Sequence, residues 1–118
     1  MLAGGALDAL AGVAEGLDVD AARMRTNLGI TRGLVFAEAV QMALAPDLGK
    51  DAAHALVARA CRRAAAENAH LRDILAREPD VTRLLDRARI DALFDPAGCL
   101  GESEAYVARA LARHPPRP

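Results

Sequence analysis

Side chains suited to nucleophilic chemistry are scarce in this sequence. The only serine is Ser103, and a nucleophilic hydroxyl needs a nearby base together with a group that orients that base. No histidine accompanies Ser103 locally, and the residue stands where the last helix is expected to begin. Capping of that helix or simple exposure is the ordinary role for serine at such a position. The sequence therefore predicts no serine nucleophile.

Potential metal ligands are also present, but their spacing is unfavourable. His54, Cys61, His70 and Cys99 contain no close pair of the C-x₂-C or H-x₃-H kind. Cys61 falls on an apolar helix face, which is typical of a small buried hydrophobic residue. No glycine-rich phosphate loop follows a predicted strand. We therefore expect no metal site, no organic cofactor and no catalytic residue within this chain.

Charged residues give two further candidates, and both have ordinary structural explanations. Glu38 is the main acid in an otherwise apolar segment, where we expect an ion pair with Arg32 rather than acid–base catalysis. A stripe of arginines could bind phosphate or nucleic acid, but acids interrupt it and no aromatic side chains alternate with it. A solvated helix face explains it better; its members are Arg59, Arg62, Arg63, His70, Asp73 and Arg77.

The composition predicts a single all-α unit. The chain has 118 residues, of which 53% are hydrophobic and 26% charged, and the apolar residues are mostly alanine and leucine rather than aromatic or β-branched. A net charge of −1 gives no electrostatic reason for a nucleic-acid or membrane partner. Two cysteines and an N-terminus without a basic region favour a reducing compartment, and we expect a cytoplasmic protein.

The first segment differs from the rest of the chain. From Leu2 to Leu17 it is apolar over most of its girth, with Asp8 and Glu15 as the clear polar edge. Such a helix must be buried on several sides, which this chain is too short to achieve. We therefore expect residues 1–18 to be the tail of a central-bundle helix and residues 19–118 to be a compact helical C-terminal domain.

Caps and breakers divide the expected domain into helices. Asp20, Thr31 and Asp51 are candidate N-caps, whereas Pro46 and Pro79 interrupt helices. The segment ending at Pro46 is nearly all apolar and should be the central helix. The expected helices cover residues up to Leu28, Arg32 to Ala45, Asp51 to about Arg77, Val81 to Asp86, Ala88 to Phe94, and Glu102 to Ala112.

Two stretches resemble a known superfamily. One runs Gly-Ile-Thr-Arg-Gly-Leu-Val-Phe-Ala-Glu-Ala-Val over residues 29–40, with Met-Arg-Thr-Asn-Leu just before it. The other runs Phe-Asp-Pro-Ala-Gly-Cys-Leu-Gly over residues 94–101. Their order and spacing resemble the C-terminal domain of the fumarase/aspartase superfamily. The resemblance is greatest to its 3-carboxy-cis,cis-muconate cycloisomerase family, with the adenylosuccinate lyases as close relatives.

This resemblance implies a parent chain of several hundred residues, whose middle domain forms the core of a homotetramer. The implied parent reaction is lactonisation of a small tricarboxylate by general acid–base catalysis, without metal or organic cofactor. The superfamily's catalytic serine lies in a glycine- and serine-rich loop that is absent here, so the resemblance implies no catalytic residue in this chain. It implies that Thr31, Arg32 and Glu38 orient the central helix against the bundle.

Two other interpretations stay open at this point. The same domain could belong to an adenylosuccinate lyase or another lyase of the superfamily, because the fold would be identical. The chain could also be a free-standing helical interaction module without any catalytic domain. That third interpretation expects residues 2–17 to fold back on their own chain or to self-associate.

Overall fold

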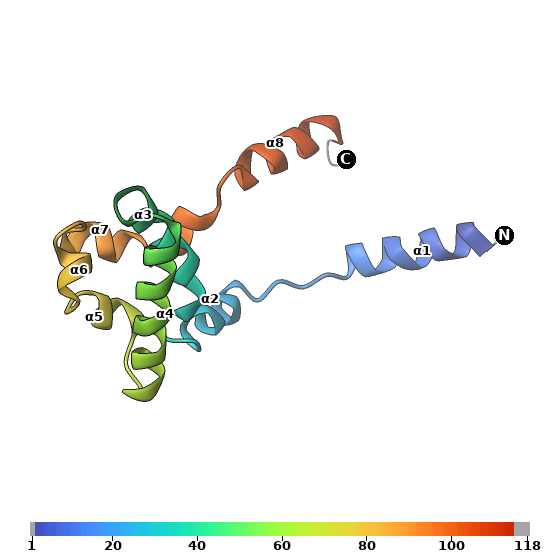
Figure 1. The fold of residues 1–118 in the computed structure, drawn as a ribbon. Helices are drawn as coiled ribbons and strands as arrows, with labels where there is room; N and C mark the ends of the chain where they lie inside the picture. The colour runs from blue at the N-terminus through green and yellow to red at the C-terminus, as the bar shows by residue number, and fades with distance from the viewer. Residues whose placement is uncertain (1, 115–118) are drawn as a thin grey trace.

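The computed structural model describes residues 2–114, and this part of the chain contains helices and no strand (Figure 1). The all-α prediction is therefore confirmed. The elements in chain order are α1 (Leu2–Glu15), α2 (Ala21–Gly29), η1 (Leu34–Phe36), α3 (Ala37–Leu48), α4 (Lys50–Ala66), α5 (Leu71–Leu75), α6 (Pro79–Thr82), α7 (Arg87–Ala92), η2 (Pro96–Cys99) and α8 (Ser103–Arg113).

The hydrophobic core lies entirely within residues 33–96, which we call the compact unit. Helix α4 packs against α3 on one side and α5 on another, and α7 closes over α5. Removing this apolar surface from water is the main force that holds the unit together. The core residues are Val40, Leu44, Ala53, Leu56, Val57, Ala60, Ala64, Leu71, Ile74, Leu75, Val81, Leu85 and Ile90.

Helix α4, rather than α3, is the centre of this unit. It contributes five buried residues, whereas α3 buries only Val40 and Leu44. Met42 of α3 is 69% exposed despite its apolar side chain. The sequence predicted α3 as the central helix from its apolar content, and that prediction is wrong because much of its apolar surface faces outward.

The expected long helix from Asp51 to Arg77 is two helices in the structure. Asn68 adopts φ +54°, the left-handed conformation that commonly ends a helix. The Asn68 N–H donates to the Ala65 carbonyl at 3.4 Å and the Ala69 N–H to the Ala64 carbonyl at 2.9 Å. This pair of bonds is a Schellman motif, which asparagine tolerates better than most residues. Asn68 is consequently exposed. The sequence predicted that it would lie on one continuous apolar seam with Val57, Cys61, Ala64, Leu71 and Leu75, and that prediction is wrong for Asn68.

Both predicted ends of the third helix also differ from the structure. Residues 30–33 form a turn, and Thr31 Oγ1 accepts a long hydrogen bond from the Val35 N–H at 3.4 Å, so that α3 begins only at Ala37. Pro46 lies inside α3, which continues to Leu48. Proline removes one helical donor near the end of the helix. Three residues further on, the bond from the Gly49 N–H to the Ala45 carbonyl forms at 2.9 Å.

Other local predictions are confirmed or shifted slightly. Asp20 caps α2, because its side chain accepts from the Arg23 N–H at 2.8 Å. The cap of α4 is Gly49 rather than Asp51, which lies in the first turn of that helix. The two short helices after Pro79 and the last helix are present, and their ends are those given above.

Two helical arms flank the compact unit: the N-terminal arm, residues 2–32, and the C-terminal arm, residues 97–114. Residues 3–32 and 97–114 are all exposed. Figure 1 shows α1 and α8 reaching away from the unit on the same side, α1 beyond a non-helical linker. The radius of gyration is 20.1 Å, compared with about 13.5 Å for a globular chain of this length. The arms account for this extension.

No single helix in the described part is long and apolar enough to cross a membrane. Helix α2 and the segment from η1 through α3 reach that length and composition only together, and they are bent by 83°.

Candidate functional site

Ser103 is the first residue of α8, and the residue in the cap position is Glu102. No side-chain hydrogen bond caps the helix, and Ser103 is exposed. Of the two roles expected from the sequence, exposure is correct and capping is not. Among the described residues, the Ser103 hydroxyl therefore neither caps the helix nor forms a side-chain hydrogen bond with a possible catalytic base.

His54 and Cys61 line a groove between α3 and α4, together with Glu38 and Gln41. His54 Nδ1 lies 3.1 Å from Gln41 Oε1. Burial raises the pKa of the Cys61 thiol, and nearby Arg62 opposes that shift only in part. The Cys61 thiol is therefore less reactive than an ordinary one, because the thiolate is the nucleophilic form.

The potential metal ligands are not gathered into one site. Cys99 is exposed on η2, and His70 lies at the start of α5. Within residues 2–114, no three or more histidine, cysteine or acidic side chains come together in a way that could hold a metal ion.

Glu38 and Arg32 do not form the expected ion pair. Both are exposed, and none of the ion pairs among the described residues includes either of them. Glu38 lies in the first turn of α3, where a carboxylate is stabilised by the helix dipole. The prediction fails because residues six positions apart do not face each other even on a continuous helix, where facing neighbours are three or four positions apart. Here a turn also lies between them.

His70 occupies the most constrained polar position in the structure. It caps α5, because its Nδ1 accepts from the Arg72 N–H at 3.2 Å. That bond requires an unprotonated Nδ1, so the neutral ring carries its proton on Nε2. Burial lowers the pKa of His70, Arg72 lowers it further and Asp73 partly opposes both effects. The neutral form of His70 is thus the one that the fold favours.

The His70 ring packs edge-on against Phe94 with centroids 5.4 Å apart, and Phe94 meets Phe36 in the same manner at 5.7 Å. Gly33 lies against this cluster. A Cβ at Gly33 would lie 2.5 Å from His70 Cε1 and 2.9 Å from Phe94 Cε1. Gly33 also has φ +84°, so both space and backbone conformation require glycine. Three segments of the compact unit meet at this junction.

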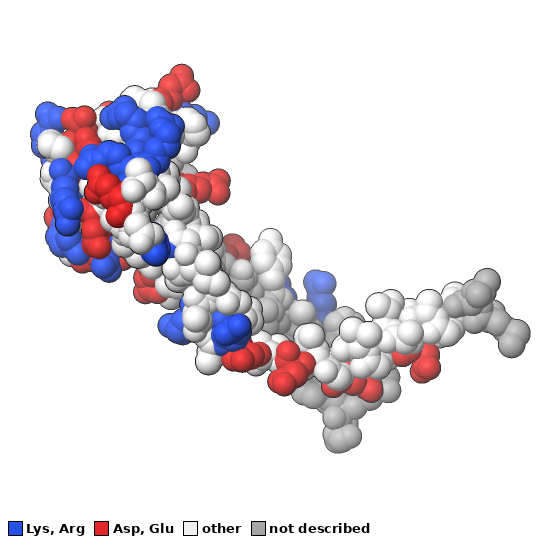
Figure 2. All heavy atoms as spheres, turned by 90° about the horizontal axis from the view of Figure 1, so that it is seen from below, with Lys and Arg blue, Asp and Glu red and all other residues white. Residues whose placement is uncertain are grey.

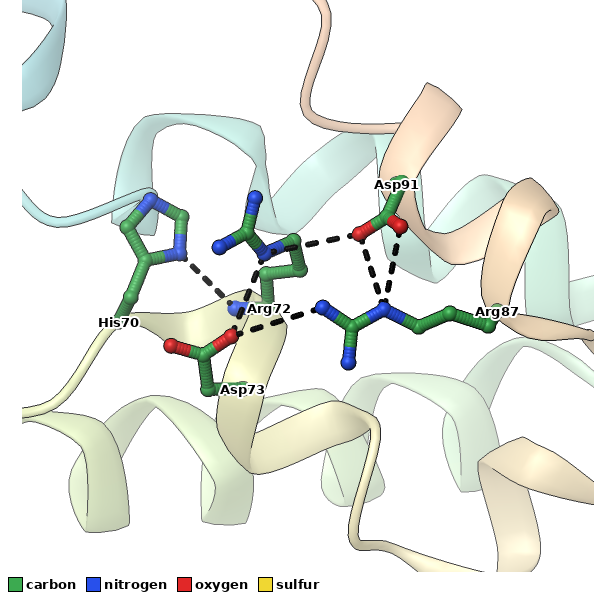
Figure 3. A network of polar contacts seen from close by, with 5 residues as sticks. All are labelled: His70, Arg72, Asp73, Arg87 and Asp91. Atoms are coloured by element: carbon green, nitrogen blue, oxygen red, sulfur yellow. Dashed lines mark hydrogen bonds and ion pairs between the residues drawn. The ribbon is translucent and has the colours of Figure 1, made fainter.

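A charge network lies beside His70 and links α5 to α7 (Figure 3). Arg87 Nε lies 3.1 Å from Asp91 Oδ2, and Arg72 Nε lies 3.3 Å from Asp73 Oδ1 and 3.6 Å from Asp91 Oδ1. Each arginine thus has carboxylate partners, and the four charges balance. A balanced, half-exposed network of this kind is suited to holding two helices together rather than to proton transfer. We interpret it as structural.

Sequence reasoning missed both this network and the close approach at Gly33. Arg87 and Asp91 are four residues apart on one helix, which is a recognisable pairing signal. The pairing of α7 with α5 has no local signal, because it depends on how the chain folds between them. The glycine after Thr31-Arg32 could have suggested a left-handed turn.

Most of the large apolar side chains that are exposed among the described residues lie on the arms, although Val35, Met42 and Leu84 of the compact unit are exposed as well. Figure 2 shows basic and acidic side chains intermingled over the compact unit, whereas the α1 arm is largely uncharged, with acidic side chains as its only visible charges. Exposed apolar faces of this extent mark interaction surfaces. The large apolar residues exposed on the arms are Leu7, Leu10, Val13, Leu17, Val19, Met24, Leu28, Ile30, Leu100, Tyr106, Val107 and Leu111.

Within residues 2–114 the structure is an all-helical unit flanked by arms whose apolar faces are exposed. Residues 33–110 match the family described as the adenylosuccinate lyase C-terminus. The chain belongs to this family.

The chain is similar to particular proteins within that class. It is 51% identical to the 3-carboxy-cis,cis-muconate cycloisomerase of Pseudomonas aeruginosa over 96% of this chain and 25% of the relative. With the enzyme of the same name from Bradyrhizobium diazoefficiens it shares 50% identity over 94% of this chain and 25% of the relative. The solved 3-carboxy-cis,cis-muconate lactonizing enzyme of Pseudomonas putida superposes with a TM-score of 0.77 at 52% identity, covering 86% of this chain and 23% of that one. The chain thus spans about a quarter of the length of these relatives.

Proposed function

We propose that this chain is the C-terminal domain of a 3-carboxy-cis,cis-muconate cycloisomerase, with the catalytic groups elsewhere in the parent protein. The observation that carries the proposal is 51% identity with such an enzyme across 96% of this chain. The chain spans about a quarter of the length of that relative, so most of the parent protein lies outside these 118 residues.

The reaction of the parent is the intramolecular addition of a carboxylate across a double bond, which yields 4-carboxymuconolactone. General acid–base catalysis with stabilisation of an aci-carboxylate intermediate accomplishes it. The substrate binds to the parent protein and not to this domain alone, since the chain spans only about a quarter of the length of its relatives.

Within the parent, this domain supports assembly. Segment 1–18, whose described helix α1 ends at Glu15, supplies the end of a central-bundle helix, and segment 19–118 supplies the C-terminal domain that packs beside it. The exposed apolar faces of α1 and α8 supply surfaces for the rest of the parent chain and for other subunits of a homotetramer. Packing there removes from water the apolar area that the domain leaves uncovered.

The test is the activity of the polypeptide obtained by extending this reading frame upstream of Met1. It should lactonise 3-carboxy-cis,cis-muconate, and the 118-residue chain assayed beside it should be inactive. Adenylosuccinate is offered in parallel, because the matching family is named for that lyase.

Cleavage of adenylosuccinate without lactonisation would assign the chain to an adenylosuccinate lyase instead. Activity on neither substrate, or the lack of an upstream reading frame, would contradict the proposal and favour a non-enzymatic interaction module.

A further inference from the structure

Arg32 lies in a backbone conformation that arginine rarely adopts. Its φ is +49°, and the next residue, Gly33, has φ +84°. Left-handed φ values are uncommon outside glycine and cost free energy for a residue with a Cβ. The close contact with His70 explains why position 33 is glycine. It does not explain why arginine occupies position 32.

The surrounding structure holds this turn rigidly. The Arg32 N–H donates to the Gly29 carbonyl at 3.0 Å, and the Arg32 carbonyl accepts from the Leu71 N–H at 3.0 Å. Leu71 is a fully buried core residue that follows the His70 cap directly. The position of the Arg32 backbone is therefore fixed from both sides, and its exposed side chain starts from a well-defined point.

Arg32 lines a hollow of about 170 Å³ whose other walls are mainly apolar. Ala64 and Ala65 near the end of α4 and Ala69 in the connection to α5 line it as well, and these small residues let a neighbouring segment come close. Ile30, which is 72% exposed, also lines the hollow. A hollow of this size is smaller than the usual small-molecule site, so it fits one inserted side chain better than a tricarboxylate.

The polar groups of the hollow are donors. No described carboxylate pairs with the Arg32 guanidinium. The only hydrogen bond of the Thr31 hydroxyl within residues 2–114 is the one it accepts from the Val35 N–H, which leaves its own hydrogen free to donate. A guanidinium and a hydroxyl donor side by side match a carboxylate, to which arginine binds through two parallel hydrogen bonds.

We propose that Arg32 and Thr31 form a docking point for an aspartate or glutamate side chain from the part of the assembly outside these 118 residues. The inference rests on the proposed function, because the chain covers only 25% of the first relative's length and most of that assembly therefore lies elsewhere. The acidic residue enters the hollow with its stem against the three alanines, and its carboxylate meets the guanidinium.

The experiment uses the full-length protein from the extended reading frame, with Arg32→Gln and Arg32→Gly as variants. Arg32→Gln keeps the length of the side chain and loses its charge, whereas Arg32→Gly also removes the left-handed strain. Arg59→Gln is the matched control, because Arg59 is an exposed arginine on α4 that forms no ion pair among the described residues. Sedimentation at graded protein and salt concentrations measures the dissociation of the assembly.

Both Arg32 variants should raise the dissociation constant of the assembly at least about tenfold at low salt, with a smaller rise at high salt. Arg59→Gln should leave it unchanged. In the 118-residue chain alone, Arg32→Gly should melt at the same temperature as the parent sequence or higher, because glycine accepts this φ. The defect then belongs to docking and not to folding.

An unchanged dissociation constant in both Arg32 variants would overturn the inference and leave the proposed function standing. A raised KM with unchanged assembly would also overturn it, because the carboxylate would then be the substrate's. A full-length protein that lactonises nothing before any substitution would instead remove the proposed function on which the inference rests.

Discussion

Residues 33–96 and the two arms contain similar apolar side chains, but those of the compact unit are mostly buried and those of the arms are exposed. Leu71, Ile74 and Leu75 of the compact unit are completely buried, whereas Leu10 and Val13 of α1 are 64% and 67% exposed. Helices α1 and α8 of the arms each carry an apolar face, but neither is packed against a second element that would bury it. Helical periodicity therefore specifies a helix and not its burial, which depends on what the rest of the molecule offers.

The largest loss of unfolding free energy is expected when a buried side chain of the compact unit is truncated. Leu75→Ala removes a fully buried side chain of α5 and leaves a cavity, so the free energy of unfolding should fall by about 2–5 kcal/mol. Urea denaturation followed by circular dichroism measures it. Leu10→Ala is the matched control in α1 and should leave the unfolding of the compact unit unchanged. Equal losses for both variants would mean that α1 belongs to the same cooperative unit.

A smaller loss is expected at the junction of the compact unit. Gly33→Ala places a Cβ against His70 and Phe94 at a positive φ and should cost about 1–3 kcal/mol of unfolding free energy. Gly29→Ala is the control, because a Cβ there meets nothing within 4 Å and the residue is helical. That control should be neutral or stabilising by up to about 1 kcal/mol. Thermal melting of both variants shows whether the two glycines differ.

The network between α5 and α7 should contribute still less. Its ion pairs are partly exposed, so Arg87→Gln should lower the free energy of unfolding by about 0.2–1 kcal/mol. High salt should reduce the difference between variant and parent, because salt screens exposed charges. A loss that is independent of salt would indicate that the aliphatic part of Arg87, rather than its charge, stabilises the contact.

The pH dependence of the compact unit should reflect His70. Folding lowers the pKa of His70 below its unfolded-state value of about 6.5. The contribution of neutral His70 to the free energy of unfolding is therefore complete above about pH 6.5 and declines as the pH falls below it. The effect should be modest, since His70 is only half-buried. His70→Asn retains a capping acceptor without titrating there. Between pH 7.5 and 5.5 the urea midpoint of the unsubstituted chain should therefore fall by more than that of the His70→Asn variant.

A substitution in an arm should have the smallest effect on the free energy of unfolding. Its main effect should be on self-association. Leu10→Asp changes an exposed residue of α1, so the unfolding free energy of the compact unit should change by less than about 0.5 kcal/mol. Self-association of the free chain, measured by light scattering, should decrease. Loss of protection against hydrogen exchange within residues 33–96 would instead show that the arm stabilises the core.

The sequence was sufficient for features that depend on neighbouring residues. The Asp20 cap, the helical character of the main helices and the unusual apolar girth of α1 could all be recognised locally. The division of the long helix was predictable in principle from Asn68, yet an uninterrupted apolar spacing on both sides concealed it. Local signals therefore described helices better than the breaks between them.

Features that join distant segments could not be predicted in this way. The expected Arg32–Glu38 pair does not form, because residues six positions apart lie on different faces of a helix and the turn at Gly33 also lies between them. The contact of Gly33 with His70 and Phe94 joins three segments that are far apart in sequence. Likewise, whether the candidate chemical residues of this chain come together into one site depends on the tertiary arrangement and has no local signal.

The linker between α1 and α2 also has a consequence for the fate of the polypeptide in a cell. Residues 17–20 are non-helical and exposed, and they follow a helix whose leucines face solvent. Chaperones and proteases recognise this kind of segment. A copy left without partners would be trimmed first at residues 17–20 and would release the remainder as a stable fragment. Pairing with other polypeptides would then determine the half-life of the protein.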